Sequence, residues 1–555
     1  MSWLENPGRY FGSYDLTELN VDEAYLNITT DSPVYLYGLT DECYRCPFTY
    51  INKFDGSSIL KVSTVNKLYW RLYKNVTSKI IDENNQDYIC EVRPKTFGEF
   101  GVYELEQNNN TCILTTVKDP VNIYLSLLII ILCLFTLALF YSIVCCTRHL
   151  CKKHKGDEEG QIETVKNKRV TAIDTFRGLC IVLMIFVNDG AGGYSILQHA
   201  TWNGLHLADL LFPWFMWIMG VCIPISVKSQ LNKEITRLKI LSSVLRRSVL
   251  LFLLGIALNT VDVGPELSTL RIFGVLQRFS ISYFITAVLV TLFMLNSNVK
   301  KLKGSEDLIN LSLIWIIMIF IVAVHLYLTF YFPLPGCPTG YIGPGGIHYN
   351  GIYQNCTGGI TGYVDKLVLG MNHIYHNPTS KLIYKSLPFD PEGIFGCLLA
   401  TFQVFLGVIA GCIIITYPEW KQRMKRWLIW GAIFGIAGLV LCQARQEGGW
   451  IPLNKNLWSL SYVAVTSSLG FFILTIFNFI IDEQNLWSGA PFKYPGMNAI
   501  LLYVGHELCW NLFPWHFRYG RMNTHLILTV EAIWGTFLWI LISYWMHKNK
   551  FYLAL

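Results

Sequence analysis

Long apolar segments constrain the fold of this chain more than any other feature. No charged residue occurs between Val121 and Cys145, a stretch longer than the roughly 20 residues that cross a bilayer as a helix. Further apolar segments lie near residues 172–188, 206–227, 241–259, 272–296, 309–332, 393–416, 427–442, 458–481, 497–511 and 526–546. Only 15% of the residues are charged, against about 25% in an average soluble domain. The sequence therefore predicts a polytopic α-helical membrane protein with about 11 transmembrane helices.

Residues 1–120 have a different composition from the rest of the chain. They are polar and contain no apolar run that could span a membrane. Short strand-like stretches at Val34–Tyr37, Tyr69–Tyr73 and Val102–Leu105 predict a small β-rich domain. Acceptor sequons for N-glycosylation, which act only in translocated segments, occur at Asn27, Asn75, Asn109 and Asn355.

Six cysteines lie outside the apolar segments. They are Cys43, Cys46, Cys90 and Cys112 in the polar domain, and Cys337 and Cys356 in a later polar loop. An even number of cysteines in translocated segments favours disulfide bonds. The alternative for Cys43-x-x-Cys46 is half of a zinc site or a redox pair, but no second pair of this kind and no histidine cluster accompanies it.

Basic residues gather in alternate loops and set the orientation of the chain. They are Arg148, Lys152, Lys153, Lys155, Lys166, Lys168, Arg169, Lys228, Lys233, Arg237, Lys239, Lys300, Lys301, Lys303, Lys421, Arg423, Lys425, Arg426, Lys548 and Lys550. The opposite short loops, 189–205 and 260–270, contain no lysine or arginine. Cytosolic loops carry the excess of basic residues, so we expect a lumenal N-terminus and a cytosolic C-terminus. The net charge of +6 is too small and too scattered to indicate a nucleic-acid partner.

These patterns divide the chain into four parts. We expect a lumenal domain over 1–120, a first transmembrane helix over 121–145, a flexible cytosolic linker over 146–170, and a ten-helix bundle over 171–555 with a lumenal loop at 333–392. A lumenal domain normally follows a signal peptide, yet residues 1–31 have no apolar core. We expect the natural chain to begin further upstream, and the alternative is that the first span carries the domain across.

Charged residues inside spans are costly and are functional candidates. Asp174 and Arg177 open the second span at a spacing that allows an ion pair on one helix face, so a structural pair is the alternative. Arg246 and Arg247 lie in the fourth span, where snorkelling to the interface explains at least one of them.

A second charged group lies near the lumenal end of the fifth span, where Gln277 precedes Arg278. An arginine at this depth needs an anionic partner, which Asp209 of the third span or a ligand phosphate could supply. Several intramembrane arginines without matching acids therefore favour an anionic ligand.

The loop at 189–205 is the strongest candidate for a site. It is rich in glycine, which permits close approach of a ligand to the backbone, and it contains His199. Histidine is the general base best matched to mildly acidic or neutral pH. The alternative is a structural histidine, as His206, His325 and His506 could be. None of these residues has a metal-ligand spacing, so no metal is indicated.

The chain resembles the heparan-α-glucosaminide N-acetyltransferase family from about residue 170 onward. The matching motifs are Asp174-Thr-Phe-Arg-Gly, Phe186-Val-Asn188, His199-Ala-Thr-Trp-Asn203-Gly, Ala208-Asp209-Leu-Leu-Phe-Pro-Trp-Phe, Gly274-Val-Leu-Gln-Arg278, Cys337-Pro-Thr-Gly-Tyr-Ile-Gly-Pro-Gly-Gly, Asn355-Cys-Thr-Gly-Gly, Asp390-Pro-Glu-Gly393, Asn454-Lys-Asn-Leu-Trp-Ser-Leu-Ser-Tyr462, Tyr494-Pro-Gly-Met-Asn and Tyr503-Val-Gly-His506-Glu507.

The resemblance implies an enzyme of the lysosomal membrane. Cytosolic acetyl-CoA, the co-substrate, would give its acetyl group to the non-reducing terminal α-glucosamine of heparan sulfate in the lumen. Coenzyme A would then be the anionic ligand of Asp174, Arg177, Arg246, Arg247, Gln277 and Arg278. The family's catalytic histidine falls at His199, and its site asparagine falls at Asn188.

Acyl transfer from a thioester to an amine has chemical requirements that these residues could meet. We expect His199 to act as general base and Asn188 and Asn203 to stabilise the oxyanion, with Asp209 in the catalytic set. Transfer within a ternary complex is favoured, and an acetyl-His199 intermediate is the alternative. Two other functions stay open: transfer to another lumenal amine or hydroxyl, and transport of an anionic ligand. The sequence gives no oligomeric state, although a homodimer is plausible.

Overall fold

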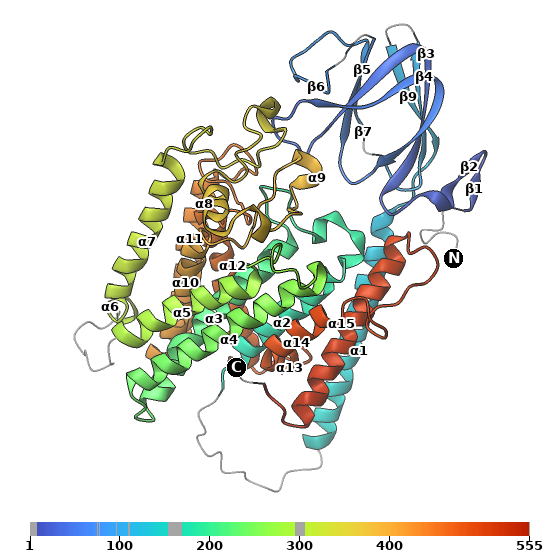
Figure 1. Cartoon of the computed structure of the whole chain (residues 1–555). Coiled ribbons are helices and arrows are strands. Elements are labelled where there is room, and N and C mark those ends of the chain that lie inside the picture. Colours follow the sequence, from blue (N-terminus) through green and yellow to red (C-terminus); the bar gives the residue numbers. More distant parts are fainter. Residues whose placement is uncertain are drawn as a thin grey trace.

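The computed structural model describes residues 8–74, 76, 78–95, 97–108, 111–153, 169–294 and 306–553. Figure 1 shows a bundle of long helices with a β domain at one end. We call the end of the bundle that faces this domain the domain end, and the opposite end the far end. Arg169, Lys228 and Arg237 lie at the far end, because the loop at 189–205, at the other end of the adjoining helices, contacts His525, which also contacts the β domain. The predicted fold class, a polytopic helical protein with an N-terminal β-rich domain, is confirmed.

The β domain is built around one long central strand. This strand, β3 (Glu23–Thr40), pairs antiparallel with β4 (Phe48–Ser63) and β5 (Leu68–Tyr73), and parallel with β8 (Val102–Asn108). The sheet is completed by β6 (Ile80–Ile81), β7 (Cys90–Lys95) and β9 (Thr111–Lys118), while β1 (Tyr10–Phe11) and β2 (Tyr14–Asp15) pair separately. Alternate residues of β3, such as Leu26 and Ile28, point into an apolar core, as half-buried strands require. The three predicted strand segments all fall within these strands.

The six cysteines that the sequence places outside the apolar segments pair as disulfides. The bonds are Cys43–Cys46, Cys90–Cys112 and Cys337–Cys356, which confirms the disulfide prediction over the half-zinc alternative. Within the described ranges, no group of three or more His, Cys, Asp or Glu side chains could hold a metal ion. The sequons at Asn75 and Asn109 lie outside the described residues.

Ten helices in the described part of the chain are long and apolar enough to cross a membrane. They are α1 (Ile123–Lys153), α2 (Thr171–Asn188), α3 (Leu207–Leu231), α4 (Arg237–Val263), α5 (Val275–Phe293), α7 (Ser312–Tyr331), α10 (Cys397–Thr416), α11 (Trp420–Cys442), α12 (Leu460–Phe477) and α15 (His525–Lys548). The first helix continues past Cys145 into the expected linker, of which 154–168 lie outside the described residues.

The remaining expected span, 497–511, is a broken pair of short helices. These are α13 (Lys493–Met497) and α14 (Ala499–Leu508). Gly496 of α13 meets the first turns of α2 so closely that an added Cβ would lie 1.8 Å from the carbonyl oxygen of Asp174. At the other end of α2, Asn188 contacts His506 of α14. The short pair therefore runs beside α2 from the far end to the domain end.

The β domain and the helix connections meet at the domain end. Nε2 of His525, the first residue of α15, lies 3.2 Å from the carboxylate of Asp22 in the β domain. The other ring nitrogen of His525 lies 2.7 Å from the carbonyl oxygen of Gly192, in the loop between α2 and α3. On the long loop that contains α8 (Ile360–Leu369) and α9 (Lys381–Tyr384), the hydroxyl of Tyr384 accepts a hydrogen bond from the amide of Tyr44 at 3.0 Å. The loop at 189–205 therefore contacts the start of α15, which in turn contacts the β domain.

Candidate active site

His199 and Asp209 form a hydrogen-bonded pair at the domain end of the bundle. Asp209 is the third residue of α3, and its Oδ2 accepts the backbone amides of Ala200 and His206, both at 3.1 Å. Its Oδ1 lies 2.7 Å from Nδ1 of His199, so the Nδ1–H of the ring donates to it. The carboxylate is 1% exposed and the imidazole 35% exposed. This arrangement leaves Nε2 as the ring nitrogen of His199 that can accept a proton, as a general base requires.

A lysine from a distant segment completes this pair. The Nζ of Lys455 lies 3.1 Å from Nδ1 and 3.2 Å from Nε2 of His199, and 3.9 Å from Oδ1 of Asp209. Only 16% of the lysine side chain is exposed. Burial lowers the pKa of Lys455, while the carboxylates of Asp209 and Glu392 oppose this effect.

The surroundings of His199 favour its neutral form. Desolvation and the ammonium of Lys455 lower the pKa of His199, and they outweigh the opposing effects of Asp209 and Glu392. A neutral imidazole can accept a proton, whereas an imidazolium cannot. The site is therefore arranged so that the base stays active below the ordinary titration range of histidine.

The side chain of Asn203 is bonded beside the turn that carries the lysine. Its Nδ2 donates to Glu447 at 2.7 Å, and its Oδ1 accepts a hydrogen bond from Nδ2 of Asn454 at 2.9 Å. The oxygen of the Asn454 side chain in turn accepts the amide of Leu457 at 2.8 Å, which closes the turn that carries Lys455. In this structure the Asn203 amide positions that turn.

Asn188 lies in a second polar group, at the end of α2. Its Nδ2 lies 3.0 Å from Nε2 of His506 and 3.3 Å from a carboxylate oxygen of Glu507. The other ring nitrogen of His506 faces the carbonyl oxygen of Leu502 at 3.3 Å, so Nε2 accepts from Asn188. The carbonyl oxygen of the Asn188 side chain makes none of these bonds.

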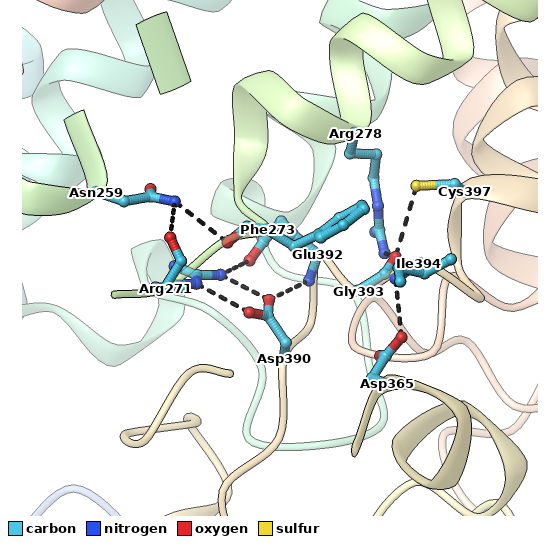
Figure 2. A network of polar contacts seen from close by, with 10 residues as sticks. All are labelled: Asn259, Arg271, Phe273, Arg278, Asp365, Asp390, Glu392, Gly393, Ile394 and Cys397. Carbon is cyan, nitrogen blue, oxygen red and sulfur yellow. Dashed lines mark hydrogen bonds and ion pairs between the residues drawn. The ribbon is translucent and has the colours of Figure 1, made fainter. Parts of the chain in front are cut away.

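A buried ionic network holds the turn at residues 390–393 against the start of α5 (Figure 2). Arg271 donates to both oxygens of Asp390, at 2.9 and 2.7 Å, and to Oε2 of Glu392 at 2.7 Å. Arg278 donates to the carbonyl oxygen of Gly393 at 3.1 Å and is 1% exposed. Asp365 accepts the amide of Ile394 at 2.8 Å, and burial raises its pKa to about 7.

This network corrects one expectation from the sequence. Asp209 was a candidate ion partner for Arg278, but its carboxylate is occupied by His199, Lys455 and two backbone amides. The guanidinium of Arg278 instead lies over the ring of Trp458, 4.8 Å from its centroid. Cation–π contact and a backbone carbonyl thus stabilise the buried charge in place of a carboxylate.

A basic cavity of about 250 Å³ opens nearer the far end. Arg177 and Arg247 both line it, together with polar residues of α3 such as Ser226 and Gln230. Arg177 is held by Asp174, whose carboxylate accepts its Nη2 at 2.6 Å. The Nε of Arg247 is buried without a hydrogen-bond partner, so this guanidinium retains capacity for an anionic ligand.

The other charged candidates lie elsewhere. Arg246 is exposed on the outer face of α4, and it does not line the cavity. Gln277 is buried against α4, where its Nε2 lies 3.5 Å from the carbonyl oxygen of Phe252. Arg278 belongs to the network at the domain end described above. The structure therefore brings Asp174, Arg177 and Arg247 together and separates the other three from them.

A smaller apolar cavity extends the basic one toward the domain end. It has a volume of about 30 Å³ and shares Phe215, Phe279, Ala499 and Ile500 with the larger cavity. It ends at Tyr503, one turn of α14 before His506. The two cavities mark a path between α3, α5 and α14 from the basic residues toward Asn188.

Sequence reasoning missed Lys455 and Glu392 as site residues. Both occur inside motifs that carry the family resemblance, Asn454-Lys-Asn and Asp390-Pro-Glu, which was the available signal. Neither lies on a span, so the search for charges in the membrane did not find them.

Fold and site together define a polytopic membrane protein with a histidine–carboxylate site at one end of its bundle and a basic cavity toward the other. Residues 169–335 match the family model described as heparan-alpha-glucosaminide N-acetyltransferase, catalytic. Over 96% of its length the chain is 35% identical to heparan-alpha-glucosaminide N-acetyltransferase of Mus musculus, of which it covers 89%. It is 34% identical to the Homo sapiens protein of the same name, again over 96% of this chain and over 88% of the human protein. The chain belongs to the heparan-α-glucosaminide N-acetyltransferase family and is an acetyltransferase, as the motifs predicted.

Proposed function

We propose that the protein transfers the acetyl group of cytosolic acetyl-CoA across the lysosomal membrane to the non-reducing terminal α-glucosamine of heparan sulfate. The observation that carries this proposal is the His199–Asp209 pair at the domain end, together with two adjoining cavities that lead from the basic residues toward that end. The relatives are named as heparan-alpha-glucosaminide N-acetyltransferases, which supports the acceptor in this proposal. The basic loops at the far end support a cytosolic position for that end and a lumenal position for the β domain.

The basic cavity suits the phosphates of coenzyme A. Arginine recognises phosphate oxygens through a planar fork of donors, and Arg177 and Arg247 present two such groups on one cavity. The unpartnered Nε of Arg247 supplies a free donor. The apolar walls of the narrow cavity suit the uncharged pantetheine arm, and its small volume requires α14 or its neighbours to move when the arm enters.

His199 acts as the general base in this proposal. Glucosamine arrives as an ammonium in an acidic lumen and must lose a proton before its nitrogen can attack the thioester. The Nε2 atom of His199 takes that proton, while Asp209 holds the ring in the correct tautomer from Nδ1. The lowered pKa of His199 keeps the base available at acidic pH.

Asn188 stabilises the oxyanion that forms on the thioester carbonyl. Its amide now points to His506 and Glu507, and exchange of the longer 3.3 Å contact with Glu507 frees one N–H for the oxyanion. One such donor contributes about 3–4 kcal/mol to transition-state stabilisation. Since Asn203 is engaged in the support of Lys455, we assign the donor role to Asn188 alone.

We favour direct transfer within a ternary complex over an acetyl-His199 intermediate. The path leads the thioester to the same end of the bundle at which His199 is 35% exposed, so donor and acceptor can meet there. Acetylated His199 formed from acetyl-CoA in the absence of sugar, at a rate that matches turnover, would contradict this preference.

A matched pair of histidine variants tests the proposed base. The purified protein is given acetyl-CoA and glucosamine, and N-acetylglucosamine is measured for His199→Ala and His206→Ala. His206 lies on the same loop, where its ring lies 3.2 Å from the carbonyl oxygen of Gln198 and caps the start of α3. We expect a loss of two to four orders of magnitude in kcat for His199→Ala and near-normal kcat for His206→Ala. Equal effects of the two substitutions would reject His199 as the base.

A further inference from the structure

Lys455 has no role in the reaction as described above, although its ammonium is in contact with the imidazole of the base. Its ammonium lies 3.1 and 3.2 Å from the two ring nitrogens of His199. Because the ammonium is almost equally far from both ring nitrogens, it lies over the face of the ring, and the in-plane lone pair of Nε2 stays available to accept a proton. If His199 were protonated, two cations would be in contact at this distance.

Three charged side chains, from three different segments, act on the imidazole of His199. Asp209 of α3 supplies one negative charge, and Lys455 of the segment between α11 and α12 supplies one positive charge. Glu392 of the segment before α10 also acts on the imidazole, but its Oε2 is held by Arg271 at 2.7 Å. With His199 neutral, Asp209 and Lys455 balance each other; with His199 protonated, this corner of the site carries a net positive charge.

The position of Lys455 is fixed by its own turn. Its carbonyl oxygen accepts the amide of Trp458 at 3.0 Å, and the neighbouring Asn454 is bonded to Asn203 and to the amide of Leu457. A long lysine side chain normally reaches into solvent, but this one is only 16% exposed. The fold therefore places an ammonium against the base at the cost of its hydration.

We propose that Lys455 is a positioning residue that keeps His199 neutral, and so competent as a base, in acidic surroundings. The inference rests on the proposed function, because it assumes that His199 is the base. Lys455 acts on His199 through the charge of its ammonium and neither takes nor gives a proton in the reaction. Loss of that charge leaves Asp209 to stabilise the imidazolium, so His199 becomes protonated at a higher pH than in the parent protein.

The test is the pH dependence of kcat, measured with saturating acetyl-CoA and glucosamine between about pH 4.5 and 8. In Lys455→Met we expect the acidic limb to move up by about one pH unit, which is a tenfold loss of activity on that limb and little loss at the neutral end. Lys455→Gln, which keeps a hydrogen-bond donor without the charge, should show the same shift. Lys455→Arg should retain the parent profile. Lys381→Met removes an exposed lysine at the same end of the bundle and serves as the control.

The outcomes separate this inference from the proposed function. An equal loss at every pH for Lys455→Gln and Lys455→Met, or an unchanged acidic limb, overturns the role of Lys455. A shifted limb in Lys455→Arg also overturns it, since the positive charge is retained. If His199→Ala keeps normal kcat, the proposed base fails; if His199→Ala is inactive and the Lys455 variants keep the parent profile, only the inference about Lys455 fails.

Discussion

Replacement of Asp209 by asparagine separates the catalytic role of this residue from its structural role. Oδ2 of Asp209 accepts two backbone amides, those of Ala200 and His206, both at 3.1 Å. The side-chain oxygen of an asparagine will keep these two bonds, which forces its NH2 group toward Nδ1 of His199. The ring must then accept at Nδ1 and carry its proton on Nε2, so the nitrogen that should take the proton from the acceptor is already protonated.

The expected loss of activity follows from the hydrogen bond between Nδ1–H of His199 and the carboxylate of Asp209, which the asparagine variant cannot form. A hydrogen bond to a charged group contributes about 1.5–3 kcal/mol, which corresponds to about 10- to 150-fold in rate. We therefore expect kcat of Asp209→Asn to fall by at least about tenfold. Stability should change little, since both backbone amides at the start of α3 remain bonded.

The assay measures kcat from the coenzyme A thiol released at saturating substrates, together with the midpoint of thermal unfolding in detergent. Asp482→Asn is the matched control, because Asp482 accepts the amides of Thr171 and Ala172 at the far end, at 3.0 and 3.1 Å. This control should keep its kcat. A kcat of Asp209→Asn within threefold of the parent, or an equal loss in both variants, would refute the reasoning.

Three further substitutions test the ligand cavity and the packing. Arg247→Ala should raise the KM for acetyl-CoA by about tenfold or more, because a charge-assisted hydrogen bond of about 1.5–3 kcal/mol is lost. The KM for glucosamine should change little. An unchanged KM for acetyl-CoA would reject the cavity as the acetyl-CoA site. Arg271→Leu leaves Asp390 and Glu392 buried without their cation. It should lower the free energy of unfolding by about 3–5 kcal/mol, which is measured as a lower thermal midpoint. An unchanged midpoint would mean that the ionic network does not stabilise the fold. Gly496→Ala places a Cβ 1.8 Å from the carbonyl oxygen of Asp174 in α2. We therefore expect the folded fraction in size-exclusion chromatography to fall. A normal yield of folded protein would contradict the close packing of α13 on α2.

Composition and hydropathy predict most of this fold because the bilayer requires long apolar helices. They do not predict that 497–511 forms two short helices. The apolar window looks like an ordinary span, and only the glycine contact between α13 and the start of α2 shows how a short broken pair crosses the same thickness as α2. Contacts of this kind depend on backbone approach between distant segments, which periodicity does not report.

The site was predictable only in part, because some of its contacts also join segments that are distant in the sequence. His199 stands out as a histidine in a glycine-rich loop between two spans, and Arg177 and Arg247 stand out as charges within spans. Asp209 was one candidate partner for Arg278, with a ligand phosphate as the other. Its place in the first turn of α3 instead lets its carboxylate accept the backbone amide of the N-cap residue His206 and bond His199. Lys455 is separated from His199 by most of the bundle sequence, so its contact with the ring follows only from the folded structure.

The central claim is that acetyl transfer takes place across the membrane. Vesicles that hold the protein with its β domain inside are loaded with glucosamine and given acetyl-labelled acetyl-CoA outside only. We expect labelled N-acetylglucosamine to accumulate inside and free coenzyme A to appear outside. With His199→Ala we expect neither product to form. Labelled acetyl-CoA or free coenzyme A accumulating inside without labelled N-acetylglucosamine would show transport in place of transfer and would contradict the account.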